Sequence, residues 1–133
     1  MRATITRRVR FAAARRIWSE ALDEAGNQRH FGRDADLHGH DFTLEVTLGG
    51  QVPPATGMVM DLKALSALLR SEVTVPLDRT RLDGHEFLAG RPATTENLAV
   101  AIWRRIEPRL APGALIEVML MVGDGLKVRY RGE

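Results

Sequence analysis

The strongest constraint on the fold is a run near the middle of the chain in which apolar and polar residues alternate strictly. The run extends from Phe42 to Leu48 and is followed by the pair Gly49-Gly50. Successive side chains of a β-strand point to opposite faces, so this pattern is typical of a strand with one buried face. Residues 42–48 are therefore predicted to form a half-buried strand of a sheet.

Three other segments alternate in the same way, although less strictly: residues 2–14, 116–122 and 126–130. The last two are separated by Gly123-Asp124-Gly125, a composition typical of a tight turn, so they are predicted to form a hairpin. Residues 15–37 instead carry charge, glycine and asparagine without sustained periodicity. They are predicted to form a long loop, which in a small domain is either functional or packed on a neighbour.

Two segments place apolar residues at helical spacing. The first covers Asp61 to Val73, with Asp61 as the predicted N-cap. The second begins at Thr94 or Thr95, whose hydroxyl can cap the helix, and continues to about Leu110.

The order of predicted elements along the chain is strand, strand, helix, helix, strand, strand. This order is typical of an α+β fold, here one domain over residues 1–133 that consists of a four-stranded antiparallel sheet with two helices on one face. The other face and the sheet edges are left uncovered. We therefore expect a homo-oligomer.

The composition excludes several classes of function. The chain has 133 residues, 44% apolar and 27% charged, as is typical of a soluble globular protein. No segment approaches the roughly 20 apolar residues of a membrane span, and the first residues lack the apolar region of a secretory signal, so we expect a cytoplasmic protein without membrane contact. The net charge is only +2 and the basic residues are scattered, which argues against nucleic-acid binding. The absence of cysteine excludes disulfides, thiolate metal ligands and a cysteine nucleophile.

The most conspicuous local feature is His38-Gly39-His40, just before the strictly alternating strand. On an extended chain these two imidazoles point to the same face and could hold one metal ion together. A catalytic zinc site needs a third protein ligand, and the other histidines are His30 and His85. Without a third ligand, the two imidazoles would be a polar pair satisfied by hydrogen bonds, and both interpretations stay open.

Seven segments, in the right order and with only small gaps, give the chain a resemblance to a known family. They are Phe11-Ala12-Ala13-Ala14, Asn27 with Phe31-Gly32, His38-Gly39-His40, Pro54 to Leu62, Pro76-Leu77-Asp78, Thr94 to Val100 with Ile102-Trp103, and Tyr130-Arg131-Gly132-Glu133. Across nearly its whole length the chain resembles 6-pyruvoyltetrahydropterin synthases and, more distantly, bacterial 6-carboxytetrahydropterin synthases.

This resemblance implies a tunnelling fold, in which the sheets of several subunits join edge to edge into a barrel. The expected partners are a small-molecule ligand and further copies of the chain, as a trimer or as a hexamer of two stacked trimers. In that family the active site lies between subunits. Three histidines hold zinc, a cysteine acts with an Asp and His pair in proton transfer, and a glutamate anchors the pterin.

The resemblance places Arg15 where the family has its first zinc histidine. A guanidinium is always protonated and cannot ligate zinc. The other two zinc histidines correspond to His38 and His40. We therefore expect no metal and no other cofactor, or at most weak zinc binding by the two histidines with help from Asp34.

Other catalytic positions differ as well. The cysteine position holds Asp34, the Asp and His pair reads Asp78-Arg79, and the pterin-anchoring glutamate is replaced by Val122. A valine cannot pair with the donor edge of a pterin, and a buried donor left unpaired costs roughly 1–3 kcal/mol. Three positions that border the pterin pocket in the family are unchanged. These predicted substrate-binding residues, beside Val122, are Thr94, Thr95 and Glu96.

Three interpretations of the function follow. The first is a repurposed, metal-independent enzyme of the lyase or cyclase type, which acts on a small carbonyl or heterocyclic metabolite, as in the biosynthesis of a specialised metabolite. Its predicted catalytic residues are Arg15, Asp34, His38, His40, Asp78 and Arg79. The second is a non-catalytic pseudoenzyme or small-molecule-binding protein in which Arg15 pairs with Asp34 and Arg79 with Asp78. The third is a residual zinc-dependent tetrahydropterin synthase activity in which the metal ligands are rearranged.

Overall fold

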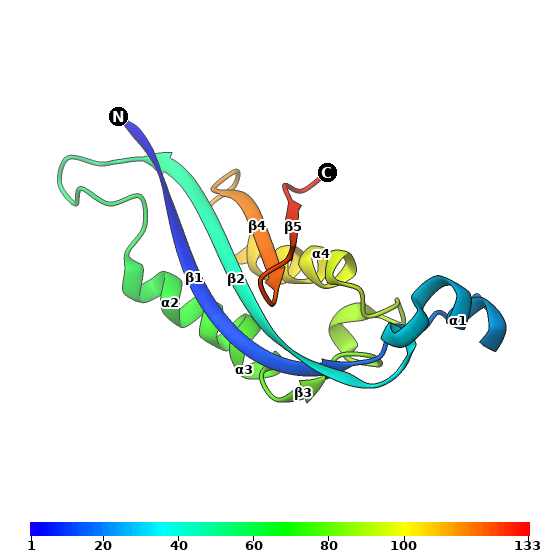
Figure 1. Cartoon of the computed structure of the whole chain (residues 1–133). Coiled ribbons are helices and arrows are strands. Elements are labelled where there is room, and N and C mark those ends of the chain that lie inside the picture. The colour runs from blue at the N-terminus through cyan, green and yellow to red at the C-terminus, as the bar shows by residue number, and fades with distance from the viewer.

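The computed structural model describes all residues, 1–133. Its strands are β1 (Arg2–Arg15), β2 (His38–Gln51), β3 (Thr80–Arg81), β4 (Leu115–Val122) and β5 (Leu126–Tyr130). Its helices are α1 (Glu24–Phe31), α2 (Leu62–Leu69), α3 (Val75–Leu77) and α4 (Thr95–Ile106). The long β1 and β2 run side by side through the molecule, and α1 lies beyond one end of them (Figure 1).

The five strands form one mixed sheet in the order β3-β1-β2-β4-β5. β1 and β2 pair antiparallel without a break from Arg2 opposite Gln51 to Arg15 opposite His38. The predicted four-stranded antiparallel sheet is therefore not matched, because β3 adds a fifth strand that runs parallel to β1. A strand of two residues is too short to leave a periodic pattern in the sequence.

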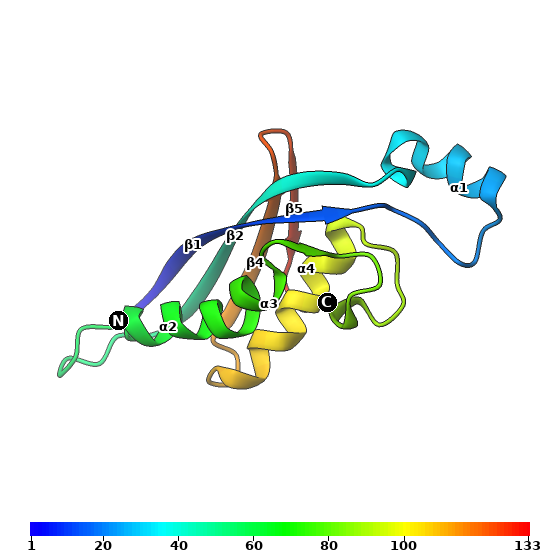
Figure 2. The same cartoon turned by 90° about the horizontal axis from the view of Figure 1, so that it is seen from below.

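The core lies between the sheet and the helices on one of its faces, α2 and α4 (Figure 2). Phe42, Leu44 and Val46 are fully buried, as their alternation with polar residues predicted. Phe11 on β1 is opposite Phe42 in the register, and their rings stack with centroids 5.0 Å apart. This pair fixes which side chains of β1 and β2 face the helices.

The first predicted helix is interrupted. Asp61 caps α2 by accepting a hydrogen bond from the Lys63 backbone N–H at 3.0 Å, but α2 is followed by a π-helical turn over Arg70–Thr74. Pro76 explains the irregularity, because its ring crowds the carbonyl four residues earlier and it has no N–H to donate. That carbonyl belongs to Glu72 and accepts instead from Arg105 Nε at 2.9 Å.

The second predicted helix, α4, is capped by Thr94, whose hydroxyl accepts from the Asn97 backbone N–H at 3.2 Å. It ends at Ile106, a few residues earlier than predicted, because Pro108 falls in a 3₁₀ turn over Glu107–Arg109. No helix of the structure is long and apolar enough to cross a membrane.

The segment predicted as a long loop contains a helix, α1, and a 3₁₀ turn over Gly32–Ala35. It has no apolar periodicity because it is organised around Asn27, which is fully buried. The Asn27 side chain accepts from the Ser19 backbone N–H at 2.7 Å and donates to the carbonyls of Ser19 and Asp23, both at 3.0 Å. A polar residue at the centre of a small helix gives no signal in a hydrophobicity pattern.

Candidate functional site

Three predicted site residues meet where β1 ends and β2 begins. Arg15 is opposite His38 in the register, and His40 is opposite Ala13. All lie on the face of the sheet that carries Phe11 and Phe42, because residues two apart on a strand share a face. Arg15 is only 4% exposed, which is unusual for an arginine.

The Arg15 guanidinium lies at the start of α4. Its Nη1 donates to the Ala93 carbonyl at 2.9 Å and to the Thr95 hydroxyl at 3.1 Å, and its central carbon lies 5.3 Å from the centroid of the Phe42 ring. Its Nε is buried and has no hydrogen-bond partner. Burial lowers the pKa of Arg15, and the charges of Asp34 and, less strongly, Glu96 oppose that shift.

His38 has one satisfied ring nitrogen and one free one. Nδ1 lies 2.7 Å from the Asp36 carbonyl, which can only accept, so Nδ1 carries the ring proton. In the neutral ring, Nε2 is then a hydrogen-bond acceptor. It is buried without a partner, with Asp34 Oδ1 at 4.0 Å.

His40 contacts the His38 ring edge to face, with the ring centroids 4.6 Å apart. Burial lowers the pKa of His40 most, the charges of Arg15 and His38 lower it further, and Asp34 opposes the shift. His40 therefore stays neutral near pH 7. A neutral imidazole can either donate or accept a proton.

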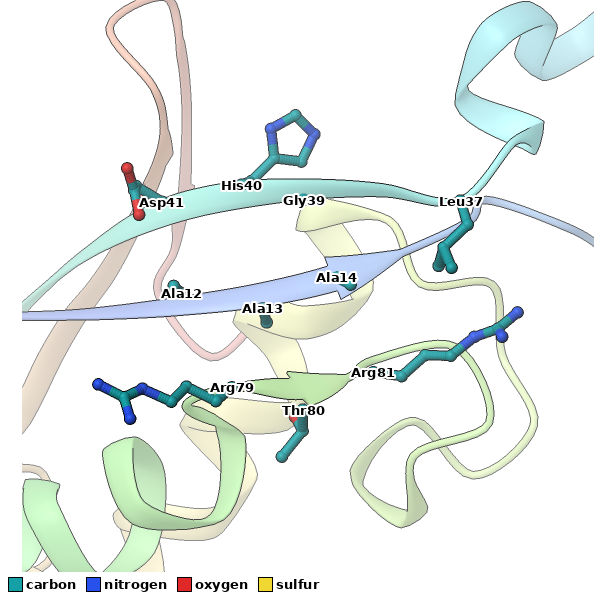
Figure 3. A pocket seen from close by; sticks show the side chains of 10 residues that line it. All are labelled: Ala12, Ala13, Ala14, Leu37, Gly39, His40, Asp41, Arg79, Thr80 and Arg81. Atoms are coloured by element: carbon teal, nitrogen blue, oxygen red, sulfur yellow. The ribbon is translucent and has the colours of Figure 1, made fainter.

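His40 also borders an open cavity of about 600 Å³ (Figure 3). The cavity is lined by Ala12, Ala13, Ala14, Leu37, Gly39, His40, Asp41, Arg79, Thr80 and Arg81. Arg15 and His38 do not line it. Most of the lining, including Ala12, Ala14, Gly39 and Asp41, alternates with the residues that share a face with Arg15 and His38, so the cavity lies on the opposite face of the sheet from the buried pair.

The side chains present do not fit a three-ligand zinc site. No group of three or more histidine, cysteine, aspartate or glutamate side chains in the structure could hold a metal ion. His30 is exposed on α1, and His85 caps a 3₁₀ turn over Glu86–Leu88, where its Nδ1 accepts from the Phe87 backbone N–H at 3.1 Å. Neither histidine joins His38 and His40, and Arg15 supplies a cation where a third ligand would be needed.

Asp78 and Arg79 are bound to the neighbouring strand β1. The Ala12 backbone N–H donates to Asp78 Oδ1 at 2.9 Å, and the Arg79 backbone N–H donates to the Ala12 carbonyl at 2.6 Å. The Arg79 side chain is 90% exposed, with its Nε 3.9 Å from Asp78 Oδ2. Arg79 and Arg81 extend away from each other at the rim of the cavity, so Arg79 does not join Arg15 (Figure 3).

The predicted substrate-binding residues fall into two groups. Thr94, Thr95 and Glu96 form the first turn of α4, where Thr95 contacts Arg15 and Glu96 is exposed. Val122 pairs with Phe42 across β2 and β4 and packs against the core.

Sequence reasoning missed the backbone carbonyls of Asp36 and Ala93, because any residue carries a carbonyl. It also missed Phe42 as the ring beneath Arg15.

The fold and the paired histidines at the end of its two longest strands define a small α+β domain with a polar site beside its sheet. The family model of 6-pyruvoyl tetrahydropterin synthase matches residues 4–133. The 6-pyruvoyl tetrahydrobiopterin synthase of Homo sapiens is 37% identical over 134 residues, which cover 98% of this chain and 92% of the relative, and that of Drosophila melanogaster is also 37% identical, covering 98% and 80%. The chain therefore belongs to the 6-pyruvoyl tetrahydropterin synthase family.

Solved structures agree with this assignment. The 6-pyruvoyl tetrahydropterin synthase of Caenorhabditis elegans is similar with a TM-score of 0.94 at 31% identity, covering 100% of this chain and 97% of that one. The Plasmodium vivax enzyme has a TM-score of 0.72 at 17% identity, covering 98% and 97%, which shows a shared fold. The α+β tunnelling fold predicted from the resemblance is confirmed for the single chain, and a function related to that of these synthases is supported.

Proposed function

We propose that this chain is a metal-independent enzyme of the family, which carries out lyase or cyclase chemistry by proton transfer on a small carbonyl or heterocyclic metabolite. One observation carries the proposal. Arg15 is 4% exposed, makes none of the ion pairs of the structure, and keeps a buried Nε without a partner. A buried charge without a counter-ion is costly and is expected where a ligand uses it.

A guanidinium can stabilise negative charge that develops on a reacting oxygen. It is permanently charged, and its N–H groups are held in a fixed plane, so it needs little reorganisation during the reaction. The surroundings of Arg15 are largely shielded from water, which strengthens such an interaction. Loss of one donor of this kind costs about 100- to 1000-fold in rate.

The groups that could move protons lie beside this cation. His38 Nε2 is an acceptor in the neutral ring, and His40, whose pKa is lowered chiefly by burial, contacts the His38 ring. Asp34 is 63% exposed and lies 4.0 Å from His38 Nε2. A carboxylate in catalysis has a precedent in the family, because the Plasmodium vivax protein has been solved with a catalytic glutamate replaced.

A pseudoenzyme remains a second candidate, favoured by the contacts of Asp78 and Arg79. Asp78 accepts from the Ala12 backbone and lies beside the exposed Arg79, which gives both residues a structural role. The other half of that hypothesis required Arg15 to pair with Asp34. No such ion pair forms, and Asp34 lies closer to His38.

We also propose that the active form is a homo-oligomer, a trimer or two stacked trimers. The sheet ends in β3 and β5, which each have a strand neighbour on one side only. Unpaired edges of this kind favour pairing with another copy of the chain. Light scattering after size-exclusion chromatography would measure the number of subunits directly, and a monomer would contradict the proposal. A cytoplasmic location stays a prediction.

The function is tested with untagged protein, in which zinc is measured by mass spectrometry before and after incubation with zinc and desalting. Turnover is then followed on a panel of small carbonyl compounds and on dihydroneopterin triphosphate, with and without a chelator. We expect no stoichiometric zinc and chelator-resistant turnover of a carbonyl compound, which falls about 100-fold in Arg15→Gln. Arg8→Gln, on the opposite face of the sheet, is the matched control.

Near-stoichiometric zinc, together with turnover of dihydroneopterin triphosphate that a chelator abolishes, would contradict the proposal and favour a residual zinc-dependent synthase activity. Absence of turnover on every compound, with a small molecule still bound, would favour the pseudoenzyme.

A further inference from the structure

Two buried groups in this site lack hydrogen-bond partners, and they are complementary. Arg15 Nε–H is a donor, and His38 Nε2 is an acceptor in the neutral ring, because Nδ1 already donates to the Asp36 carbonyl. They are the only buried side-chain nitrogen or oxygen atoms of the structure without a partner. A buried polar atom that stays unsatisfied destabilises the fold, so two such atoms on neighbouring residues point to something that binds there.

The register makes the two residues neighbours across the strands, on the same face of the sheet. Arg15 and His38 are directly opposite on the antiparallel strands β1 and β2. Side chains at opposed positions on one face have Cβ atoms about 4.5–5.5 Å apart. One oxygen between them can accept from Arg15 Nε and donate to His38 Nε2.

We propose that Arg15 and His38 together bind one hydroxyl group of a ligand, and that the substrate class is therefore small α-hydroxy carbonyl compounds. The inference rests on the proposed function for the reaction, but the binding site stands on the two unpartnered atoms alone. The ligand oxygen accepts from Arg15 Nε–H, and its O–H donates to His38 Nε2.

The chemistry of the two partners separates a hydroxyl from other ligand groups. A cation would face the fixed positive charge of Arg15. A carboxylate would satisfy Arg15 but would leave its negative charge against the lone pair of His38 Nε2, with the Asp34 carboxylate 4.0 Å from that nitrogen. A ketone accepts but cannot donate. Only a group that both donates and accepts satisfies both atoms.

His40 is the side chain next to His38 that the remainder of the ligand would meet. The His40 ring contacts the His38 ring edge to face, with the centroids 4.6 Å apart, so a carbonyl group next to the bound hydroxyl would lie near the His40 imidazole. Arg15 contacts Thr95 at the N-terminus of α4, where the helix dipole adds partial positive charge. This favours an oxygen-rich ligand end at the buried pair.

Four small probes separate the hydroxyl from the charge: hydroxyacetone, acetone, glycolate and acetate. Each is titrated into the intact oligomer, labelled with ¹⁵N, and the Arg15 Nε–H and His38 imidazole nitrogen signals are followed by NMR. We expect both signals to shift with hydroxyacetone and glycolate, and binding about tenfold tighter than for acetone and acetate respectively. The Arg105 Nε–H signal, whose donor is already bonded to the Glu72 carbonyl, serves as an internal reference that does not move.

Two variants test the partners separately. Arg15→Lys keeps the charge but removes Nε–H, and His38→Phe keeps an aromatic ring but removes Nε2. Each should abolish the tenfold preference for the hydroxyl compound, whereas Arg8→Lys on the opposite face of the sheet should keep it. Thermal unfolding monitored by circular dichroism shows whether each variant is folded. If a variant does not fold, the titration of the wild-type chain alone decides the question.

Equal shifts with acetate and glycolate, and none with hydroxyacetone, would show a plain anion site and overturn the inference. Absence of shifts with all four probes would mean that water alone fills the pair, which also overturns it. Hydroxyl-selective shifts without turnover of any hydroxy carbonyl compound would support the binding site while the proposed function fails.

Discussion

Arg15 and Arg105 have similar surroundings but very different partners. Each guanidinium lies over an aromatic ring, at 5.3 Å from Phe42 and 4.0 Å from Phe87, and each donates to a backbone carbonyl. Arg105 also has a carboxylate, because its Nη2 donates to Glu72 Oε2 at 2.7 Å. Arg15 has none and keeps a free Nε, although it is the more buried of the two.

The difference separates a structural arginine from a functional one. The Arg105 charge is neutralised within the fold, where it holds α4 against the turn before Pro76. The Arg15 charge is left for a partner that the chain itself does not supply. Such an arrangement is expected to reduce stability in exchange for binding or catalysis.

The largest expected effect comes from removing the carboxylate of the paired arginine. Glu72→Ala leaves Arg105 and Arg109 without their shared partner, and we expect the free energy of unfolding to fall by about 2–3 kcal/mol in urea titrations. The matched control is Glu117→Ala, which also removes a carboxylate shared by two arginines, both of them more than half exposed. That loss should stay below about 1 kcal/mol. Equal losses would show that burial does not distinguish the two clusters.

A second change converts the unpaired arginine into a metal ligand. In Arg15→His a third imidazole would stand opposite His38 and beside His40, without a fixed positive charge. We expect zinc to bind roughly 100-fold more tightly than to the wild-type chain, measured by calorimetry. Arg15→Gln removes the charge without adding a ligand and should gain much less. Tight zinc binding by the wild-type chain would show that the Arg15 charge does not exclude a metal, which contradicts the functional difference drawn between Arg15 and Arg105.

A third change tests whether the unpaired arginine stabilises the fold at all. We expect Arg15→Met to alter the free energy of unfolding by less than about 1 kcal/mol, or to raise it, because an apolar side chain of similar length removes an uncompensated buried charge. Arg105→Met should instead destabilise by about 2 kcal/mol, since Glu72 loses a partner. A large loss in Arg15→Met would show that its bonds to Ala93 and Thr95 matter more than its burial.

The smallest expected effect is on the pH dependence of stability. The pKa of His40 in the folded chain is lowered, chiefly by burial, so below the ordinary histidine pKa of about 6.5 the unfolded chain binds more protons than the folded one. This contribution to stability is present above that pH and is lost as the pH falls below it. The melting temperature should therefore decrease with acidification below about pH 6.5, and less steeply in His40→Gln. The same slope in both proteins would assign the effect to other groups.

Much of the fold was predictable because it depends on periodic patterns. The alternation from Phe42 to Leu48, the hairpin around Gly123-Asp124-Gly125 and the caps at Asp61 and Thr94 all appear in the structure. β3 and α1 were not predictable, since the first is two residues long and the second is organised around a buried asparagine.

The site was predictable only in part. The resemblance identified Arg15, His38 and His40, which the structure brings together, but also Arg79, which it directs to solvent. Nothing in the sequence indicates whether an arginine finds a carboxylate, because that depends on which chain segments meet. The pseudoenzyme interpretation paired Arg15 with Asp34, but Asp34 lies near His38 instead.

The unbroken pairing of β1 with β2 has a consequence for how this site can vary. Arg15 and His38 are opposite each other because a ladder of paired residues beginning at Arg2 and Gln51 leads to them, and not because the connecting segment has a particular length. A shift by one residue would turn every side chain to the other face, so the core pattern resists it. Insertions or deletions in the connection between Arg15 and α1 should therefore leave the two side chains facing each other. New sequence could therefore be grafted into that connection beside the site, provided that Ile17 and the Ser19 contacts of Asn27 are kept.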